Sequence, residues 1–273
     1  MTYPITEIFT RQILCLALAL AFAGCGSSED TREAALVSYE YGQFYAHKGD
    51  HGTAIACYSD ALRLDPNYAA AYLARGVVYA GRGDRANAEA DFSNVIRLDA
   101  DSADAYVHRG ILYVRHGSLD TAIADFSEAL RIDPDRHVHN ERGYAYALKG
   151  DIVLALADYD RAIKRQPNQP GAYHNRGTLY MQQGQGENAV ADFNEAIRLN
   201  PGLVEAYKRR GELHARTGNL EPALTDYRRV IALNPDDAQA ATNIERIEAA
   251  LREKQGDTEP TEVPGAVNER SAE

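Results

Sequence analysis

The sequence lacks several features that point to particular classes of protein. It has no tryptophan and only three cysteines in 273 residues, and Cys15, Cys25 and Cys57 are too few and too scattered for a disulfide framework or a zinc site. Basic residues are also scarce, since 29 Lys and Arg stand against 40 Asp and Glu, which gives a formal net charge of −11. Because nucleic-acid binding needs a basic face that neutralises phosphates, we expect no nucleic-acid partner.

Motifs for catalysis or cofactor binding are missing too. No serine elbow, zinc-binding helix or phosphate loop occurs. Two stretches, 81–86 and 184–189, fit a loose dinucleotide fingerprint, but neither follows a predicted strand. His137 and His139 have the spacing of a metal pair, but no cysteine or third ligand is near them, and we interpret them as part of a solvated loop. We therefore expect no enzyme, no cofactor and no metal; the alternative is a metal-binding or enzymatic protein that uses His137, His139 and His174.

Long apolar runs are absent apart from one near the start of the chain. Residues 13–23 read ILCLALALAFA. Eleven residues are too short for a helix across the roughly 30 Å hydrocarbon core of a bilayer, but they suit the apolar region of a signal peptide. The sequence therefore predicts a targeting segment at the N-terminus.

The end of this run, Phe22-Ala23-Gly24-Cys25, resembles a bacterial lipobox, in which the cysteine is lipidated and becomes the new N-terminus. The resemblance implies a signal peptide over 1–24 and lipid attachment at Cys25. Phe22 departs from the usual Leu, and a simply cleaved secretory peptide or an uncleaved anchor stays open. Gly26 in the next position resembles lipoproteins that are sorted to the outer membrane.

A pattern with a period of about 34 residues fills the chain from residue 35 to residue 237. Each copy has a small residue at place 8, usually an aromatic at place 11, Gly at place 15, Ala at place 20, an aromatic at place 24 and usually Pro at place 32. Six copies follow one another, and one residue is missing before the fourth. Their bounds are 35–68, 69–102, 103–135, 136–169, 170–203 and 204–237.

These marks resemble the tetratricopeptide repeat (TPR), a helix-turn-helix unit of 34 residues. The resemblance implies an all-α fold, a right-handed TPR α-solenoid of six repeats. Each copy holds two apolar stripes that it cannot bury alone, so neighbouring repeats must stack. Residues 238–254 have helical periodicity without the glycine and aromatic marks, and we predict a C-terminal capping helix there. We predict a short tether over 25–34 and a disordered acidic tail over 255–273.

An Arg at place 7 and an Asp at place 23 recur together in repeats two to six. The first copy has neither, because Tyr41 and Cys57 occupy these places. Since the two residues are lost together, we predict that they pair within each repeat, across its two helices; the alternative is that both are solvated. The predicted pairs are Arg75–Asp91, Arg109–Asp125, Arg142–Asp158, Arg176–Asp192 and Arg210–Asp226.

The concave face is where we expect function, since the residues that define the repeat are used in packing. In the TPR family this face is lined by the first helix of each repeat, so the resemblance implies a partner-binding groove. Its lining grades from apolar to polar to charged along the chain, which suits a peptide with aliphatic anchors and polar groups. The candidate groove residues are Leu73, Val77, Val107, Ile111, Val114, Asn140, Tyr144, His174 and Lys208. Alternatively, the apolar wall covers the chain's own N-terminal segment or a second copy.

Together these features predict a protein–protein interaction scaffold that is lipid-anchored at the bacterial outer membrane and faces the periplasm. The chain resembles repeat lipoproteins that recruit peptidoglycan hydrolases and proteases, and others that assist pilus secretins. The resemblance implies periplasmic or envelope proteins as partners, either enzymes or assembly machinery. A homo-oligomeric structural spacer, in which the chain forms a homodimer, is the alternative.

Overall fold

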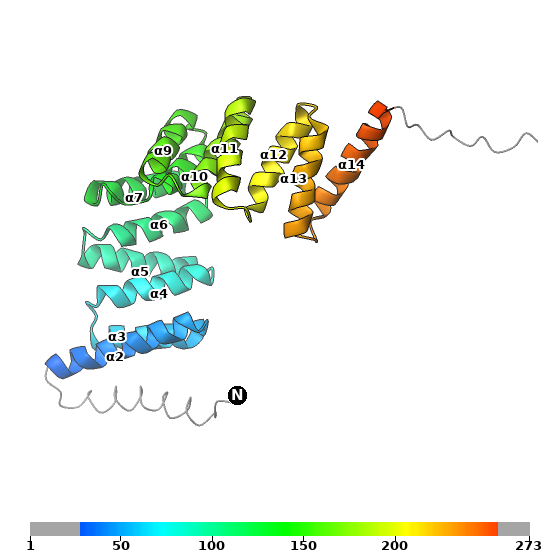
Figure 1. Cartoon of the computed structure of the whole chain (residues 1–273). Helices are drawn as coiled ribbons and strands as arrows, with labels where there is room; N and C mark the ends of the chain where they lie inside the picture. The colour runs from blue at the N-terminus through cyan, green and yellow to red at the C-terminus, as the bar shows by residue number, and fades with distance from the viewer. Residues whose placement is uncertain (1–27, 256–273) are drawn as a thin grey trace, which may run out of the picture. The chain divides into compact units, whose positions relative to one another are not determined.

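The computed structural model describes residues 28–255, and all thirteen elements in that part of the chain are α-helices (Figure 1). Twelve of them form six helix-turn-helix pairs, and α14 (Ala238–Gln255) follows the last pair. The first helices of the pairs are α2 (Ser28–His47), α4 (Ala69–Gly81), α6 (Ala103–Arg115), α8 (His139–Lys149), α10 (Pro170–Gln182) and α12 (Val204–Arg216). The second helices are α3 (His51–Leu64), α5 (Arg85–Leu98), α7 (Leu119–Ile132), α9 (Ile152–Arg165), α11 (Gly186–Leu199) and α13 (Leu220–Leu233). The predicted all-α repeat fold is confirmed.

The helices fall into two compact units, divided after Gln166. The first unit holds α2 to α9, and the second holds α10 to α14. Within each unit the two helices of a pair pack on each other, and the second helix also packs on the first helix of the next pair. This stacking is what a repeat with two apolar stripes requires.

Glycines mark the two tight places of each repeat, as the sequence predicts. At place 8 the helices of a pair cross closely: a Cβ atom on Gly110 would lie 2.7 Å from Phe126. At place 15 the chain turns between the helices with a positive φ, which is 90° at Gly150. The first place therefore needs glycine for space, and the second for its backbone conformation.

The residue missing before the fourth repeat shortens α8. This helix begins at His139, place 4 of its repeat, whereas the corresponding helices of repeats two, three, five and six begin at place 1. His139 is consequently buried as the first residue of α8, so its interpretation as part of a solvated loop is wrong. It takes the position that tyrosines occupy in repeats two, three, five and six, and its Nδ1 lies 3.5 Å from Oδ1 of Asp158.

The N-terminal end of the described chain corrects one predicted boundary. Part of the tether predicted over 25–34 is helical, because α2 begins at Ser28, and Glu29 and Asp30 lie in its first turn, where carboxylates stabilise a helix. Cys25, the predicted signal peptide over 1–24 and residues 256–273 of the predicted tail lie outside the described residues. None of the described helices is long and apolar enough to span a membrane.

All five predicted Arg–Asp pairs form within their repeats. In each pair Nε and Nη2 of the arginine donate to the two carboxylate oxygens, as between Arg109 and Asp125 at 2.9 and 2.8 Å. The aspartates are buried. Aromatic rings flank the guanidinium: the ring centroids of Tyr106 and Tyr113 lie 5.6 and 5.9 Å from Cζ of Arg109. The pairs are therefore internal, bidentate ion pairs.

Four of these arginines also reach into the preceding repeat, which the repeat pattern did not predict. Their third nitrogen, Nη1, donates to a polar side chain at place 25 of that repeat. These bonds join Arg75 to Ser59 (2.8 Å), Arg109 to Ser93 (3.1 Å), Arg142 to Ser127 (3.0 Å) and Arg210 to Asn194. One side chain thus links both helices of its own repeat to the second helix of the repeat before it.

We expect Asp125→Ala to lower the free energy of unfolding by about 3 kcal/mol, because it leaves the charge of Arg109 largely buried without a partner. The double variant Arg109→Tyr with Asp125→Cys carries the residues of the first repeat, and we expect it to cost less than the single one. Urea unfolding followed by circular dichroism measures both. The control is Glu195→Ala, which breaks an exposed pair with Arg198 and should leave the midpoint unchanged. An Asp125→Ala variant as stable as this control would contradict the prediction.

Candidate functional site

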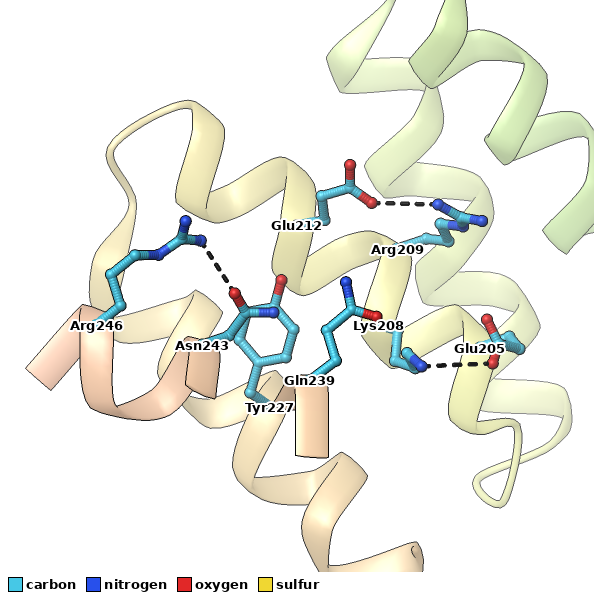
Figure 2. Close-up of a pocket in the computed structure, with 8 residues that line it drawn as sticks. All are labelled: Glu205, Lys208, Arg209, Glu212, Tyr227, Gln239, Asn243 and Arg246. Atoms are coloured by element: carbon cyan, nitrogen blue, oxygen red, sulfur yellow. Dashed lines mark hydrogen bonds and ion pairs between the residues drawn. The ribbon is translucent and has the colours of Figure 1, made fainter. Parts of the chain in front are cut away.

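A polar pocket in the second unit is the candidate binding site (Figure 2). It has a volume of about 330 Å³, within the range of sites that bind small ligands or single side chains. Helices α12 and α14 supply most of its lining, and α13 supplies one residue. The lining consists of Glu205, Lys208, Arg209 and Glu212 from α12, Tyr227 from α13, and Gln239, Asn243 and Arg246 from α14.

Helical spacing brings these side chains to one place. Residues three and four positions apart share a face of a helix. Glu205, Lys208 and Glu212 have this spacing on α12, and the three lining residues of α14 are four and three positions apart. Two polar helix faces therefore border the same space.

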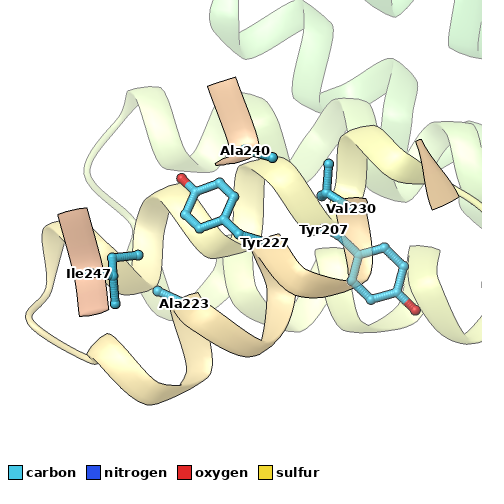
Figure 3. Packing of buried hydrophobic residues seen from close by; sticks show 6 residues of the cluster. All are labelled: Tyr207, Ala223, Tyr227, Val230, Ala240 and Ile247. Carbon is cyan, nitrogen blue, oxygen red and sulfur yellow. The ribbon is translucent and has the colours of Figure 1, made fainter. Parts of the chain in front are cut away.

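A buried cluster behind the pocket fixes α14 in position (Figure 3). Ile247 and Ala240 of α14 pack with Ala223 and Tyr227 of α13, and all four are buried. Tyr227 belongs to both the cluster and the pocket lining. Burial, and to a smaller extent the nearby Glu212 carboxylate, raises the pKa of Tyr227, so its phenol stays protonated at neutral pH and can donate a hydrogen bond.

Most of the charges of the pocket are already engaged with one another. Nζ of Lys208 lies 3.0 Å from Oδ2 of Asp237 and 3.9 Å from Oε1 of Glu205. Nη1 of Arg209 lies 3.2 Å from Oε2 of Glu212. These ion pairs hold the side chains on the α12 side of the pocket and leave that side close to neutral.

Arg246 differs from the other two cations of the pocket. Its Nη2 donates to Oδ1 of Asn243 at 3.0 Å, and its guanidinium makes no salt bridge within residues 28–255. Gln239 and Asn243 project into the same space (Figure 2). A guanidinium, two carboxamides and a phenol are groups that bind carboxylates and peptide bonds.

The groove residues predicted from the sequence are spread over both units. Lys208 lines the pocket, and His174 lies half-buried in the same unit. In the first unit Val77 and Tyr144 are exposed. The others there are half-buried, and the four aliphatic ones pack against buried clusters: Leu73, Val107, Ile111, Val114 and Asn140. Their part in partner binding stays a prediction, while the aliphatic ones contribute to the core.

The three histidines of the metal-binding alternative occupy different surroundings. His137 is exposed, whereas burial lowers the pKa of both His139 and His174. Within the described part of the chain no group of three His, Cys, Asp or Glu side chains could hold a metal ion. Nothing in the geometry therefore favours this alternative.

Of the eight lining residues only Lys208 is among the predicted groove residues, and the three on α14 were missed because this helix was treated only as a cap. The repeat register could have found these three. Counted from residue 238 as place 1, Ala240 falls at place 3 and Ile247 at place 10, and both are buried like Ala206 and Leu213 at the same places of the sixth repeat. Helix α14 is thus the first helix of a seventh repeat, of which it is the only described part, and the pocket lies between first helices of consecutive repeats.

Asp237 makes the attachment of α14 depend on pH. Its Oδ1 accepts a hydrogen bond from the backbone N–H of Ala240 at 2.9 Å, and its Oδ2 accepts one from Lys208. These bonds hold the pKa of Asp237 below its ordinary 3.8. Because the folded-state pKa is lower than the unfolded one, the stabilisation is complete well above pH 3.8 and is lost as the pH falls through the depressed pKa.

We expect Asp237→Ala to cost about 1 kcal/mol at neutral pH, through the lost helix cap, and less as the pH falls through the depressed pKa of Asp237. Asp237→Asn is the matched control, since asparagine caps a helix but does not titrate, and its stability should vary less with pH over the same range. Urea unfolding at a series of pH values measures both. A constant difference between wild type and Asp237→Ala from pH 2 to pH 7 would contradict the assignment.

Comparisons with known proteins agree with the repeat pattern. A TPR repeat model matches residues 42–83 and 143–184, and a tetratricopeptide repeat model matches residues 73–137 and 174–242. These matches together span more than half of the chain. No curated protein sequence matches it.

Several solved structures share the fold. PilW, a widely conserved type IV pilus biogenesis factor, is 22% identical, with a TM-score of 0.70 over 78% of this chain and 98% of that chain. Pseudomonas aeruginosa pilF is 16% identical, with a TM-score of 0.67 over 82% and 99%. YrrB, a TPR protein with an unusual peptide-binding site, is 23% identical, with a TM-score of 0.54 over 69% and 97%. At these identities the likeness shows the fold.

The TPR fold is that of a protein–protein interaction scaffold, and its members are generally not enzymes. The six repeats, their paired helices and the two family models lead to one conclusion: this chain belongs to the tetratricopeptide repeat family.

Proposed function

We propose that the chain is a lipid-anchored adaptor that binds a peptide segment of a partner protein in the pocket between α12 and α14. The binding part of this proposal rests on Arg246. Its guanidinium makes no salt bridge in the described structure and lies beside two carboxamides and a phenol. An arginine in this state can take a carboxylate through two parallel hydrogen bonds.

The other lining groups limit the kinds of ligand that the pocket can bind. The carboxamides of Gln239 and Asn243 can both donate and accept, so they suit the peptide bonds of an extended chain. On α12, Glu205 and Glu212 are already paired with Lys208 and Arg209, so this side of the pocket adds little net charge. The pocket therefore favours an extended peptide whose carboxylate, from a side chain or the C-terminus, meets Arg246 and whose peptide bonds meet the two carboxamides.

The anchoring half rests on the sequence before α2. The lipobox-like Phe22-Ala23-Gly24-Cys25 precedes Ser28, where α2 begins, by only three residues. At about 3.5 Å per residue, three residues span about 10 Å, so a lipid on Cys25 would hold the first repeat at the membrane. With a net charge of −11 the chain gains nothing from anionic lipids, and the acyl chains would supply the attachment. We propose the outer membrane, the periplasmic face and envelope enzymes or assembly machinery as the setting.

We expect a peptide library selected on the full chain to enrich peptides that carry a carboxylate, and Arg246→Gln to weaken the selected peptides at least tenfold, about 1.4 kcal/mol. Fluorescence anisotropy measures the affinity. Arg252→Gln, on the exposed surface of α14 outside the pocket, is the matched control and should bind like wild type. Equal binding by wild type and Arg246→Gln would refute the role given to the pocket.

We expect the wild-type chain to incorporate labelled palmitate in a bacterial host and to fractionate with the outer membrane. Cys25→Ser should lose the label and leave the membrane fraction, whereas Cys57→Ser, which changes a buried thiol, should keep both. Label retained by Cys25→Ser would rule out this attachment site.

A further inference from the structure

The side chain at place 10 follows one packing rule in repeats two, three, four and six. It inserts into a socket of the preceding repeat that consists of Ala at place 20 and the aromatic at place 24. Each inserted side chain is at most 8% exposed. The clusters that show this are Val78 with Ala54 and Tyr58, Leu112 with Ala88 and Phe92, and Leu213 with Ala189 and Phe193.

Helix α14 applies the same rule at the C-terminal end. Ile247, at place 10 of the seventh repeat, is 2% exposed and packs with Ala223 and Tyr227 of the sixth (Figure 3). The last socket of the second unit is therefore filled.

Phe44 breaks the rule at the other end of the first unit. It stands at place 10 of the first repeat, is 42% exposed, and no described helix precedes α2 to supply a socket. Leu36, on the same side of α2, is 46% exposed. Terminal repeats usually carry a polar outer face, so two large apolar side chains here are unusual. Among residues 28–255, the ring and cation contacts of Phe44 come only from its neighbours on α2. They are the ring of Tyr45 and the ammonium of Lys48, whose Nζ lies 4.4 Å from the centroid of the Phe44 ring.

The charges of this surface are acidic at its centre. Glu40 lies four residues from both Leu36 and Phe44 and hence between them on the helix face. Glu33 continues the same row by one turn. Neither glutamate forms a salt bridge with another described residue. The surface thus combines an exposed aromatic side chain, which no described helix covers, with carboxylates that form no salt bridge among the described residues.

We infer that this face of α2, formed by Glu33, Leu36, Glu40 and Phe44, binds an α-helix of a partner protein that presents a small residue and an aromatic four positions later, with basic residues beside them. The packing rule gives the shape of this partner, since every other place-10 side chain named above fits such a helix. The glutamates give its charge.

A second copy of the chain fits this face less well. In a symmetric pairing the two Glu40 carboxylates would meet at the twofold axis and repel each other. A head-to-tail contact would need an open socket at the C-terminal end, and Ile247 fills that one. The charge pattern therefore favours a different, basic helix.

Two segments of the chain itself supply matched probes. A blocked peptide of residues 152–165, IVLALADYDRAIKR, contains the socket residues Ala155 and Tyr159 and has a net charge of +1 (three basic, two acidic residues). A peptide of residues 119–132, LDTAIADFSEALRI, contains Ala122 and Phe126 and has a net charge of −2 (one basic, three acidic residues). We expect the full chain to bind the first peptide at least tenfold more tightly than the second, measured by fluorescence anisotropy.

Variants of the full chain locate the contact. Phe44→Glu should weaken the 152–165 peptide at least tenfold, and Glu33→Lys with Glu40→Lys should reverse the preference between the peptides. Arg246→Gln should leave both affinities unchanged, which separates this surface from the pocket. Circular dichroism checks that helicity is kept. Three results would overturn the inference: no binding of either peptide, binding that is insensitive to Phe44→Glu, or self-association of the free chain, seen by light scattering, that Phe44→Glu abolishes.

Discussion

The buried pair of Arg at place 7 and Asp at place 23 is the interaction on which each later repeat depends. Two charges removed from water are tolerable only when every hydrogen-bonding group is satisfied. Here the aspartate takes two nitrogens of the guanidinium, and the third nitrogen reaches a polar side chain at place 25 of the repeat before. The pair therefore fixes the crossing of two helices and the stacking of two repeats together. This also explains the first repeat, which has no described repeat before it: an arginine there would have no place-25 partner, and Tyr41 and Cys57 stand in place of the pair.

When similar repeats stack, the last one leaves an apolar face without a neighbour. Helix α14 covers this face of the sixth repeat, and the same helix forms one side of the candidate site. Ile247 and Ala240 attach α14 to the sixth repeat, and the opposite side of the same helix presents Gln239, Asn243 and Arg246 to α12. Asp237 serves both purposes, because one carboxylate oxygen caps α14 and the other holds Lys208. A helix that would otherwise only protect the core thereby acquires a polar face opposite the first helix of the sixth repeat. Structural capping and the proposed ligand binding thus fall to one helix.

The sequence was enough to predict the features that recur in every repeat, but not the details that occur only once. Six copies in register predicted the helix pairs, the glycine positions and the five ion pairs, since each was tested internally by its neighbours. The start of α8 could not be predicted, because a missing residue can shorten either a turn or a helix, and only packing decides; the result buries His139. Helix α14 was recognised as a helix but not as part of the register. Its place 8 holds Glu245 rather than glycine, and this is now understandable: glycine there makes room for the aromatic ring of a second helix, and none follows α14 among the described residues. The lining of the pocket depends on side-chain pairing across helices, which periodicity does not encode.

The two proposed binding surfaces differ in the sign of their charge, and this difference bears on which partner each of them would select. The face of α2 is acidic, in keeping with a chain whose net charge is −11, so a basic helix is attracted over a distance as well as at contact. A carboxylate that approaches the pocket is repelled at long range by the negative net charge of the chain. On the proposal it is attracted only at short range, by Arg246. Long-range attraction raises the rate of encounter and is weakened by salt, whereas a local bidentate contact in a confined pocket acts mainly on the rate of dissociation. On the two proposals, the face of α2 therefore favours fast association with a basic helix, and the pocket favours slow dissociation of an acidic peptide. On these two proposals, partners of opposite charge contact different residues, one set in each unit.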